Sequence, residues 1–228
     1  MKEKILLLHG ALGSKEQFSS IKKILEGAFD VYDLNFEGHG GVASSRAFSI
    51  ELFTNNVIDF LNKESIDRIH IFGYSMGGYV GLNIALIIPQ KILKIVTLGT
   101  KFNWDIESTR REMKMLDTEA IEKKVPHFAD KLREVHFPQD WKVIVHKTAS
   151  MMEGLSQGFN LSDEKLMMVH QEVVIGIGSL DKMVNYEESK RVSELFANGK
   201  LRLLEGVEHA IDKTDPEKIA SFVLESFK

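Results

Sequence analysis

The sequence predicts an α/β fold in which a mostly parallel sheet of about six strands is flanked by helices. Short runs rich in leucine and branched apolar residues alternate with longer amphipathic stretches, which is typical of β-α-β units. The short runs are apolar almost throughout, as expected of parallel strands buried on both faces. With 228 residues, the chain is long enough to enclose one sizeable core.

The strands and flanking helices can be assigned in chain order. Helical periodicity covers residues 15–25 and 50–63, and in the second stretch Phe53 and Leu61 share one apolar stripe. A last helix is expected to begin at Pro216, because proline is tolerated at the first helical position. Six runs are expected to form the strands: residues 4–9, 28–34, 68–74, 93–99, 172–178 and 200–205.

The interval from residue 101 to residue 170 interrupts this alternation. It contains no convincing strand, and Pro126 and Pro138 are each expected to mark the start of a new helix. A structureless loop of that length would be unusual in a compact domain. We therefore expect residues 1–100 and 171–228 to form the α/β core, and residues 101–170 to form an inserted helical lid over one edge of the sheet.

The composition excludes several classes of function. A net charge of −4 provides no basic field for a phosphate backbone, so we expect no nucleic-acid partner. The absence of cysteine excludes disulfides, thiolate catalysis and cysteine-bound zinc. No apolar run approaches the ~18 residues needed to cross a bilayer, so we expect a cytoplasmic protein with no membrane span. Separately, we expect no metal and no cofactor. The sequence leaves the oligomeric state open.

Five motifs follow the predicted strands. In an open parallel sheet, ligands bind beyond the carboxyl ends of the strands, so the residues after the strands are expected at one rim. A serine, an acid and a histidine are among them, Ser75, Asp181 and His209, in that chain order. The motifs are HGALGS at residues 9–14, GHG at 38–40, GYSMGG at 73–78, GSLD at 178–181 and GVEH at 206–209.

In this order and on these elements, the five motifs resemble the α/β-hydrolase superfamily, and in particular serine carboxylesterases with a helical lid. The resemblance covers nearly the whole chain and implies a catalytic triad in the order serine, acid, histidine. Members of the superfamily usually begin with two further strands, whereas here the first motif arrives at residue 9. We therefore expect a sheet of six parallel strands that lacks the leading hairpin.

The resemblance implies that Ser75 is a nucleophile on a strained turn between a strand and a helix. His209 would accept the serine proton and return it to the leaving group, and Asp181 would orient the imidazole. Asp105 is a rival for the acid, although it lacks the Gly-Ser-Leu-Asp context and lies at the start of the lid. The alternatives are an ordinary strand–helix turn at Ser75 and an ordinary loop acid or helix cap at Asp181.

Four further residues belong to the predicted site. Gly73 and Gly77 are expected where the turn brings the positions two before and two after the serine close together. The backbone N–H groups of Ala11, after the first strand, and Met76, at the start of a helix, would form the oxyanion hole. Preorganised donors of this kind stabilise the negative charge that develops on a carbonyl oxygen during acyl transfer.

The other histidines are expected to have structural roles. His9 and His39 would organise the loops at the rim, and His70 would pack along a strand. The lid histidines show no spacing typical of a metal site, so we expect surface or packing positions for them. They are His127, His136, His146 and His170.

The lid is rich in methionine and aromatic residues. Most are expected in the lid's own core, but some should face the sheet, where flexible thioethers suit an adaptable apolar wall. We therefore expect a small-molecule ester or acyl substrate with a modest apolar part. The residues concerned are Met113, Met115, Met151, Met152, Met167, Met168, Phe102, Trp104, Phe128, Phe137, Trp141 and Phe159.

A few positions choose among the chemistries of this superfamily. Haloalkane dehalogenases and epoxide hydrolases use an aspartate where this chain has Ser75, and the halide-binding tryptophan of dehalogenases is replaced by Met76. The lid also lacks the tyrosines that epoxide hydrolases use. We therefore expect a serine hydrolase that cleaves a small carboxylic ester or thioester through an acyl-enzyme. A perhydrolase side activity, a C–C bond hydrolase and a small-molecule sensor that retains the triad are the alternatives.

Overall fold

A computed structural model describes residues 2–228 and contains the six predicted strands. Neighbouring strands are all parallel and follow the order β2-β1-β3-β4-β5-β6. No antiparallel strand joins the sheet within residues 2–228, so the prediction of a six-stranded sheet without a leading hairpin is confirmed. The strands are β1 Glu3–Leu8, β2 Phe29–Asp33, β3 Ile69–Tyr74, β4 Ile92–Leu98, β5 Glu172–Gly178 and β6 Gly199–Leu204.

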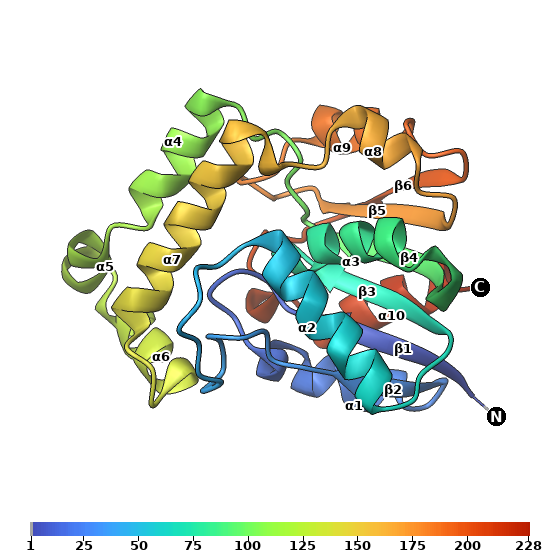
Figure 1. The fold of residues 1–228 in the computed structure, drawn as a ribbon, viewed down its shortest axis with the longest axis horizontal. Helices are drawn as coiled ribbons and strands as arrows, with labels where there is room; N and C mark the ends of the chain where they lie inside the picture. Colours follow the sequence, from blue (N-terminus) through green and yellow to red (C-terminus); the bar gives the residue numbers. More distant parts are fainter. Residues whose placement is uncertain (1) are drawn as a thin grey trace.

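Helices cover both faces of the sheet (Figure 1), with α1 and α10 on one face and α2, α3 and α9 on the other. None of the helices within residues 2–228 combines the length and apolar character that a bilayer crossing requires. The helices of this part of the fold are α1 Ser19–Leu25, α2 Ile50–Lys63, α3 Met76–Ile87, α9 Tyr186–Ser193 and α10 Pro216–Ser226, with 3-10 turns η1 Lys15–Phe18, η2 Pro89–Lys91 and η4 Ile211–Lys213.

The strand side chains alternate between two hydrophobic cores. On β1, Leu6 and Leu8 pack with α2 and α3, whereas Ile5 and Leu7 pack with α1 and α10. All four side chains are fully buried. This double burial explains why the strand is a continuous apolar run in the sequence rather than an alternating one.

Between β4 and β5 the chain forms only helices, and we call residues 101–170 the insert. Pro126 is the first residue of α6, as predicted. Pro138 lies instead in the connection before α7, whose N-cap is Asp140. The helices are α4 Ile106–Met115, α5 Thr118–Lys124, α6 Pro126–His136, α7 Trp141–Gly154, the π-helical turn η3 Leu155–Phe159 and α8 Asp163–Met167.

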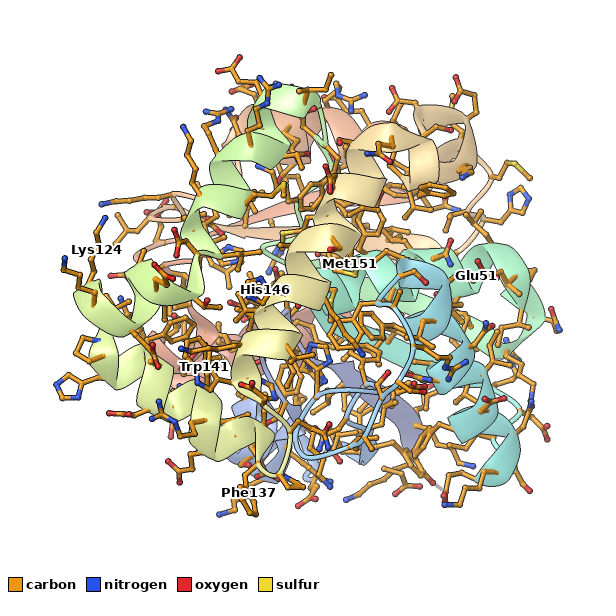
Figure 2. The ribbon with its side chains drawn as sticks, turned by 60° about the vertical axis from the view of Figure 1, so that its left-hand side comes forward. Glu51, Lys124, Phe137, Trp141, His146 and Met151 are labelled. Carbon is orange, nitrogen blue, oxygen red and sulfur yellow. The ribbon has the colours of Figure 1, made fainter. Side chains whose placement is uncertain are left out.

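The insert has a small core of its own and also packs on the main core. Leu132 of α6 packs with Trp141 and Val145 of α7 in the small core, whereas Met151 of α7 joins the core of α2 and α3. Figure 2 shows Trp141 and Met151 along α7, and Phe137 at the outer end of the α6–α7 connection, where it is 76% exposed. In Figure 1, α4 to α7 lie beyond the carboxyl ends of the strands, where the predicted site residues are.

Candidate active site

Ser75 lies on the turn between β3 and α3 and has an unfavourable backbone conformation. Its φ and ψ angles are 51° and −116°, and such strain costs a residue roughly 1–3 kcal/mol. Two hydrogen bonds to the end of β4 hold the turn: the Ser75 N–H donates to the Leu98 carbonyl at 2.8 Å, and Thr100 Oγ1 donates to the Ser75 carbonyl at 3.0 Å. The sheet therefore stabilises a strained serine that lines a cavity.

The glycines on either side of Ser75 are required by close backbone approaches. A Cβ atom on Gly73 would lie 2.5 Å from the carbonyl carbon of Gly77, which is the approach expected from the sequence. A Cβ atom on Gly77 would lie 2.0 Å from the carbonyl oxygen of Leu8. Gly77 therefore also allows α3 to pack against the end of β1, a contact that the motif alone does not predict.

Asp181 and His209 form a hydrogen-bonded pair behind the cavity. His209 Nδ1 lies 2.8 Å from Asp181 Oδ2, and the Asp181 side chain is 1% exposed. The other carboxylate oxygen, Oδ1, accepts from the backbone N–H groups of Met183 at 2.8 Å and Val184 at 2.9 Å. With Nδ1–H donating to the aspartate, Nε2 of His209 is left as the proton acceptor. Within residues 2–228 no hydrogen bond joins Ser75 Oγ to His209; such contacts often tighten only when substrate binds.

Asp105, the rival acid, has a different role in the structure. It is the N-cap of α4, where its Oδ1 accepts from the Ser108 N–H at 2.6 Å. This hydrogen bond is the main reason why the pKa of Asp105 is lowered. The Asp105 carboxylate is therefore occupied by helix capping, whereas Asp181 contacts the histidine.

The acid–histidine pair is positioned by two residues, Gly99 and Tyr74, whose roles were not predicted from the sequence. Gly99 has a φ of +62°, and a Cβ atom on it would lie 3.3 Å from both Asp181 Oδ2 and His209 Nδ1. Tyr74 Oη donates to the His209 carbonyl at 2.8 Å, and burial raises its pKa, which keeps it a donor. In the sequence, the only indication of these roles was that Gly99 and Tyr74 lie at the ends of β4 and β3, at the edge of the sheet where the motifs are expected.

The loop after β1 presents Ala11 to the same cavity as Met76. Met76 is the first residue of α3, where backbone N–H groups have no partner within the helix. Within residues 2–228 the structure records no acceptor for the N–H of Ala11 or for that of Met76. Both N–H groups are therefore free to bind an oxygen atom at the N-terminus of α3, as the donors of an oxyanion hole must be.

Buried histidines hold this loop. His9 Nδ1–H donates to the Gly10 carbonyl at 2.8 Å, while Nε2 accepts from the Phe36 N–H at 3.1 Å, and burial lowers the pKa of His9 to about 4. His136 of α6 links the same loop to its neighbour: Nε2–H donates to the Leu12 carbonyl at 3.1 Å, and Nδ1 accepts from the Gly40 N–H at 3.1 Å. His136, expected only as a surface or packing residue, therefore joins the insert to the loop that carries Ala11.

The remaining histidines have no place at the cavity. His39 is buried and stacks on Phe48, with ring centroids 5.0 Å apart. His70 packs on β3 and lies 3.3 Å from a carboxylate oxygen of Glu3. Across residues 2–228, no group of three or more histidine, aspartate or glutamate side chains is arranged to hold a metal ion.

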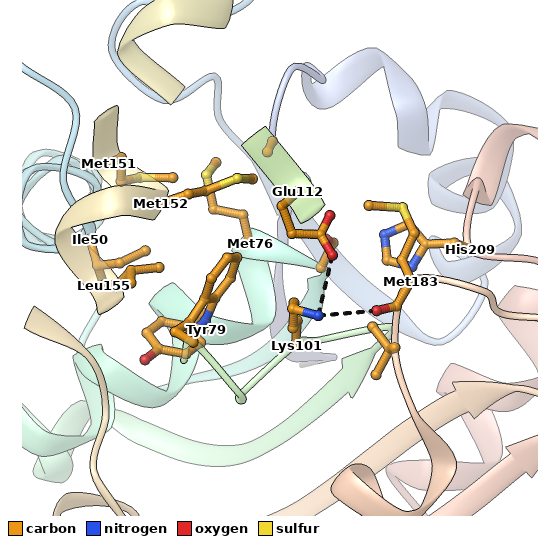
Figure 3. Close-up of a pocket in the computed structure, with 14 residues that line it drawn as sticks. Ile50, Met76, Tyr79, Lys101, Glu112, Met151, Met152, Leu155, Met183 and His209 are labelled. Carbon is orange, nitrogen blue, oxygen red and sulfur yellow. Dashed lines mark hydrogen bonds and ion pairs between the residues drawn. The ribbon is translucent and has the colours of Figure 1, made fainter. Parts of the chain in front are cut away.

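The cavity in front of Ser75 is small and mostly apolar. Its volume is about 50 Å³, and Ser75, Met76, Ala11 and His209 lie on its wall. Figure 3 shows Lys101 and Glu112 between the methionines of α7 and His209. Of the methionine and aromatic residues of the insert, Trp104, Met151 and Met152 line the cavity, whereas Met115, Phe137 and Phe159 are exposed. The apolar lining is completed by Ile50, Tyr79, Leu155, Met183 and Val184.

Comparisons with known proteins find similarity in sequence and in fold. A Wickerhamomyces anomalus protein named as a probable alcohol acetyltransferase is 29% identical over 98 residues, or 42% of this chain, and the match spans only 29% of that relative. NosK from Streptomyces actuosus superimposes with a TM-score of 0.83 at 16% identity, over 100% of this chain and 98% of its own. A thermophilic esterase from Thermogutta terrifontis gives a TM-score of 0.79 at 16% identity, covering 100% of this chain and 90% of its own.

These structural similarities extend over the whole chain, but at such low identity they establish only the fold. The family comparison is more specific, because a sequence profile described as alpha/beta hydrolase fold matches residues 4–166. That range includes β1 to β4, the Ser75 turn and most of the insert. The chain therefore belongs to the alpha/beta hydrolase fold family.

Proposed function

We propose that the protein is a serine hydrolase that cleaves a small carboxylic ester or thioester through an acyl-enzyme. The observation that carries the proposal is the convergence of Ser75, on a strained turn, with the His209–Asp181 pair at one cavity. A serine hydroxyl is a weak nucleophile unless an adjacent base takes its proton. Family membership alone leaves the reaction open, because one fold hosts many chemistries.

In the first half of the proposed reaction, His209 Nε2 takes the proton of Ser75 Oγ as that oxygen attacks the substrate carbonyl carbon. The carbonyl oxygen becomes negatively charged and is bound by the backbone N–H groups of Ala11 and Met76. When the tetrahedral intermediate collapses, the protonated His209 gives its proton to the departing alcohol or thiol. The acyl group stays on Ser75.

In the second half, a water molecule attacks the acyl carbon and loses its proton to His209. The bond to Ser75 Oγ breaks, the proton returns to the serine, and the carboxylic acid leaves. Asp181 stays ionised throughout and stabilises the imidazolium that forms twice in the cycle. Both Asp181 oxygens are occupied, by His209 and by two backbone N–H groups, which fixes the imidazole plane.

The size of the cavity suggests a short acyl group. A volume of about 50 Å³ is well below that of cavities that hold a benzene-sized ligand. We propose that the insert serves as a lid, since Trp104, Met151 and Met152 form the wall opposite the sheet. Flexible methionine side chains could still enlarge the space for a chain of a few carbons.

A second candidate is acyl transfer to an alcohol. The observation that favours it is the sequence match to relatives named as alcohol acetyltransferases, which covers 42% of this chain. The acyl-enzyme would form in the same way, but an alcohol would attack it in place of water. Supplying ethanol together with p-nitrophenyl acetate and measuring acetate against ethyl acetate distinguishes the two. A fraction of ethyl acetate among the products that exceeds the mole fraction of ethanol in the solvent would indicate a transferase.

The proposed nucleophile can be tested directly. A fluorophosphonate probe should label the wild-type protein at Ser75, and Ser75→Ala should abolish both labelling and the hydrolysis of short p-nitrophenyl esters. Ser65→Ala is a matched control, since Ser65 also has a positive φ, of 52°, but does not line the cavity. Undiminished turnover by Ser75→Ala would rule out the assignment. Ligand binding by the wild-type protein without any turnover would favour the sensor alternative.

A further inference from the structure

Two charged side chains face each other in the otherwise apolar cavity. Lys101, three residues after β4, and Glu112, on α4, line it together, with Lys101 Nζ 3.2 Å from Glu112 Oε1. Their side chains are only 16% and 8% exposed. Figure 3 shows the pair between the α7 methionines and His209. Every other charged residue of the insert lies off this cavity.

An ion pair in such a place is expensive for stability alone. Removing two charges from water costs several kcal/mol per ion, and a well-packed apolar pair of similar volume is often at least as stable. Lys101 and Glu112 are also incompletely used. The ammonium group has three N–H donors, of which one faces Glu112 and another donates to the Met183 carbonyl at 3.3 Å. Within residues 2–228 the structure records no hydrogen bond to Glu112 Oε2.

Lys101 Nζ also lies 5.9 Å from the centre of the Trp104 ring, a contact that occupies no hydrogen-bond acceptor. The pair therefore offers one donor and one acceptor that no hydrogen bond uses, with no net charge. A carboxylate ligand would satisfy Lys101 but would be repelled by Glu112, and an ammonium ligand would meet the reverse conflict. A hydroxyl group can accept from Lys101 and donate to Glu112 at the same time, leaving the ion pair intact. The indole N–H of Trp104, another wall residue, is also buried without an acceptor in the described chain.

We propose that Lys101 and Glu112 form a subsite that binds a hydroxyl group of the substrate. The inference rests on the proposed function, because it takes the cavity in front of Ser75 as the place where the substrate binds. The preferred ester or thioester then carries a hydroxyl on its acyl or alcohol part, a few bonds from the reacting carbonyl. A purely apolar chain of the same length leaves Lys101 and Glu112 without new partners and without water.

The test uses the Ser75→Ala variant and isothermal titration calorimetry, so that it depends on binding and not on turnover. The acyl-side ligands are ethyl pentanoate, ethyl 4-hydroxybutyrate, monoethyl succinate and ethyl 4-aminobutyrate, which present a methyl, hydroxyl, carboxylate or ammonium group at a similar distance. Butyl acetate and 3-hydroxypropyl acetate form the alcohol-side pair. We expect the hydroxyl ligand of at least one series to bind about tenfold more tightly than its methyl counterpart, since hydrogen bonds to charged groups are strong.

Two changes to the subsite should alter this order in different ways. In Glu112→Gln, Lys101 loses its counter-charge, so monoethyl succinate should become the tightest ligand of the acyl-side series. In the double variant Lys101→Met, Glu112→Leu, the methyl ligands should bind best. A matched control is Lys142→Met, Glu122→Leu, which removes an ion pair of 2.7 Å on the outer surface of the insert and should leave the order unchanged.

Three results would overturn the inference: tightest binding of a methyl or charged ligand to Ser75→Ala in both series, an unchanged order in Glu112→Gln, or an unchanged order in the double variant. Glu112→Gln is nearly isosteric, so it decides the matter where the double variant does not fold. Failure of the proposed function has a separate signature. A wild-type protein that is not labelled by fluorophosphonate yet binds the hydroxyl ligand most tightly would keep the subsite and lose the hydrolase.

Discussion

At Gly99, a missing side chain leaves room for the proposed acid–base pair. Gly99 has a φ of +62°. A Cβ atom at this position would lie 3.3 Å from Asp181 Oδ2 and 3.3 Å from His209 Nδ1. An alanine there must either push on the pair or shift the end of β4. Because the pair has to present Nε2 to Ser75, a displacement of a few tenths of an ångström is expected to affect the reaction more than the fold.

We therefore expect Gly99→Ala to lower kcat for short esters by about 10- to 100-fold, because misplaced catalytic groups lose rate steeply. Stability should also fall, since alanine is strained at positive φ. Gly158→Ala is the control: Gly158 has a φ of +101° and no neighbour within 4 Å of a would-be Cβ atom. It should lose stability but keep kcat. Equal kcat in both variants would contradict the positioning role.

The proposed acid can be distinguished from its rival by amide substitutions. Asp181→Asn should reduce kcat by about 10⁴-fold, because an asparagine at the equivalent place favours the wrong histidine tautomer. Asp105→Asn should leave kcat within a few-fold, since asparagine is as good a helix N-cap as aspartate. Steady-state kinetics of the two purified variants provide the measurement. The opposite ranking would move the acid to residue 105.

The sequence was informative about side chains that belong to motifs and silent about those that meet only in space. Ser75, Ala11, Met76 and His209 were placed at one rim by strand ends alone, and they line one cavity. Lys101 and Glu112 have no motif, because their pairing depends on how α4 folds back over the end of β4. The contact of Gly99 with the acid–histidine pair likewise joins three separate strands and leaves no local pattern.

Among the elements, α6 has the most direct influence on the rim loops. Its last residue, His136, binds the Leu12 carbonyl in one loop and the Gly40 N–H in the next. The insert is thus connected to the loop of the proposed oxyanion hole by hydrogen bonds as well as by apolar packing. The strand assignments were accurate within one or two residues, whereas this contact spans 124 residues of sequence and could not be predicted.

Replacing His136 by alanine should destabilise the protein and loosen the Ala11 loop. Each of the two buried backbone groups left without a partner costs roughly 1–3 kcal/mol, so we expect a loss of about 2–6 kcal/mol in the free energy of unfolding. The value of kcat should fall as well, because the Ala11 N–H is less firmly placed. His146→Ala, at an exposed position of α7, should change neither quantity. Urea unfolding and ester kinetics would reveal the contrast, and similar behaviour of both variants would argue against the link.

At the scale of the whole molecule, three buried histidines couple stability to pH. His9, His39 and His136 lie near one another, with ring centroids 5.3 Å apart for the first two and 5.7 Å apart for the last two. Burial lowers the pKa of all three. As the pH falls, the unfolded chain therefore takes up protons before the folded protein does. The stability that neutral histidines provide is present above pH 6.5 and is lost below it.

For His9 the loss can be estimated from its pKa of about 4. Against an ordinary value of 6.5, this histidine alone should remove about 2 kcal/mol of unfolding free energy between pH 7 and pH 5. His39 and His136 act in the same direction. Urea unfolding at a series of pH values should show this slope, and His9→Asn should be less stable at pH 7 but less sensitive to pH. A wild-type stability that is flat from pH 7 to pH 5 would disprove the coupling.

The insert is attached to the sheet at two ends that differ in how closely they contact the proposed site. One end is the segment from Leu98 to Lys101, after β4, and the other is the segment around His170, before β5. On the β4 side, the Leu98 carbonyl accepts from the Ser75 N–H, and Gly99 leaves space for the acid–histidine pair. Thr100 then donates to the Ser75 carbonyl, and Lys101 pairs with Glu112. On the β5 side, His170 is exposed. Changes in chain length should therefore be tolerated very differently: one glycine added after Gly99 should abolish activity, whereas one added after His170 should be nearly silent. Changes in the length of the insert are therefore expected to be tolerated at its β5 end, where they do not move the residues of the proposed active site.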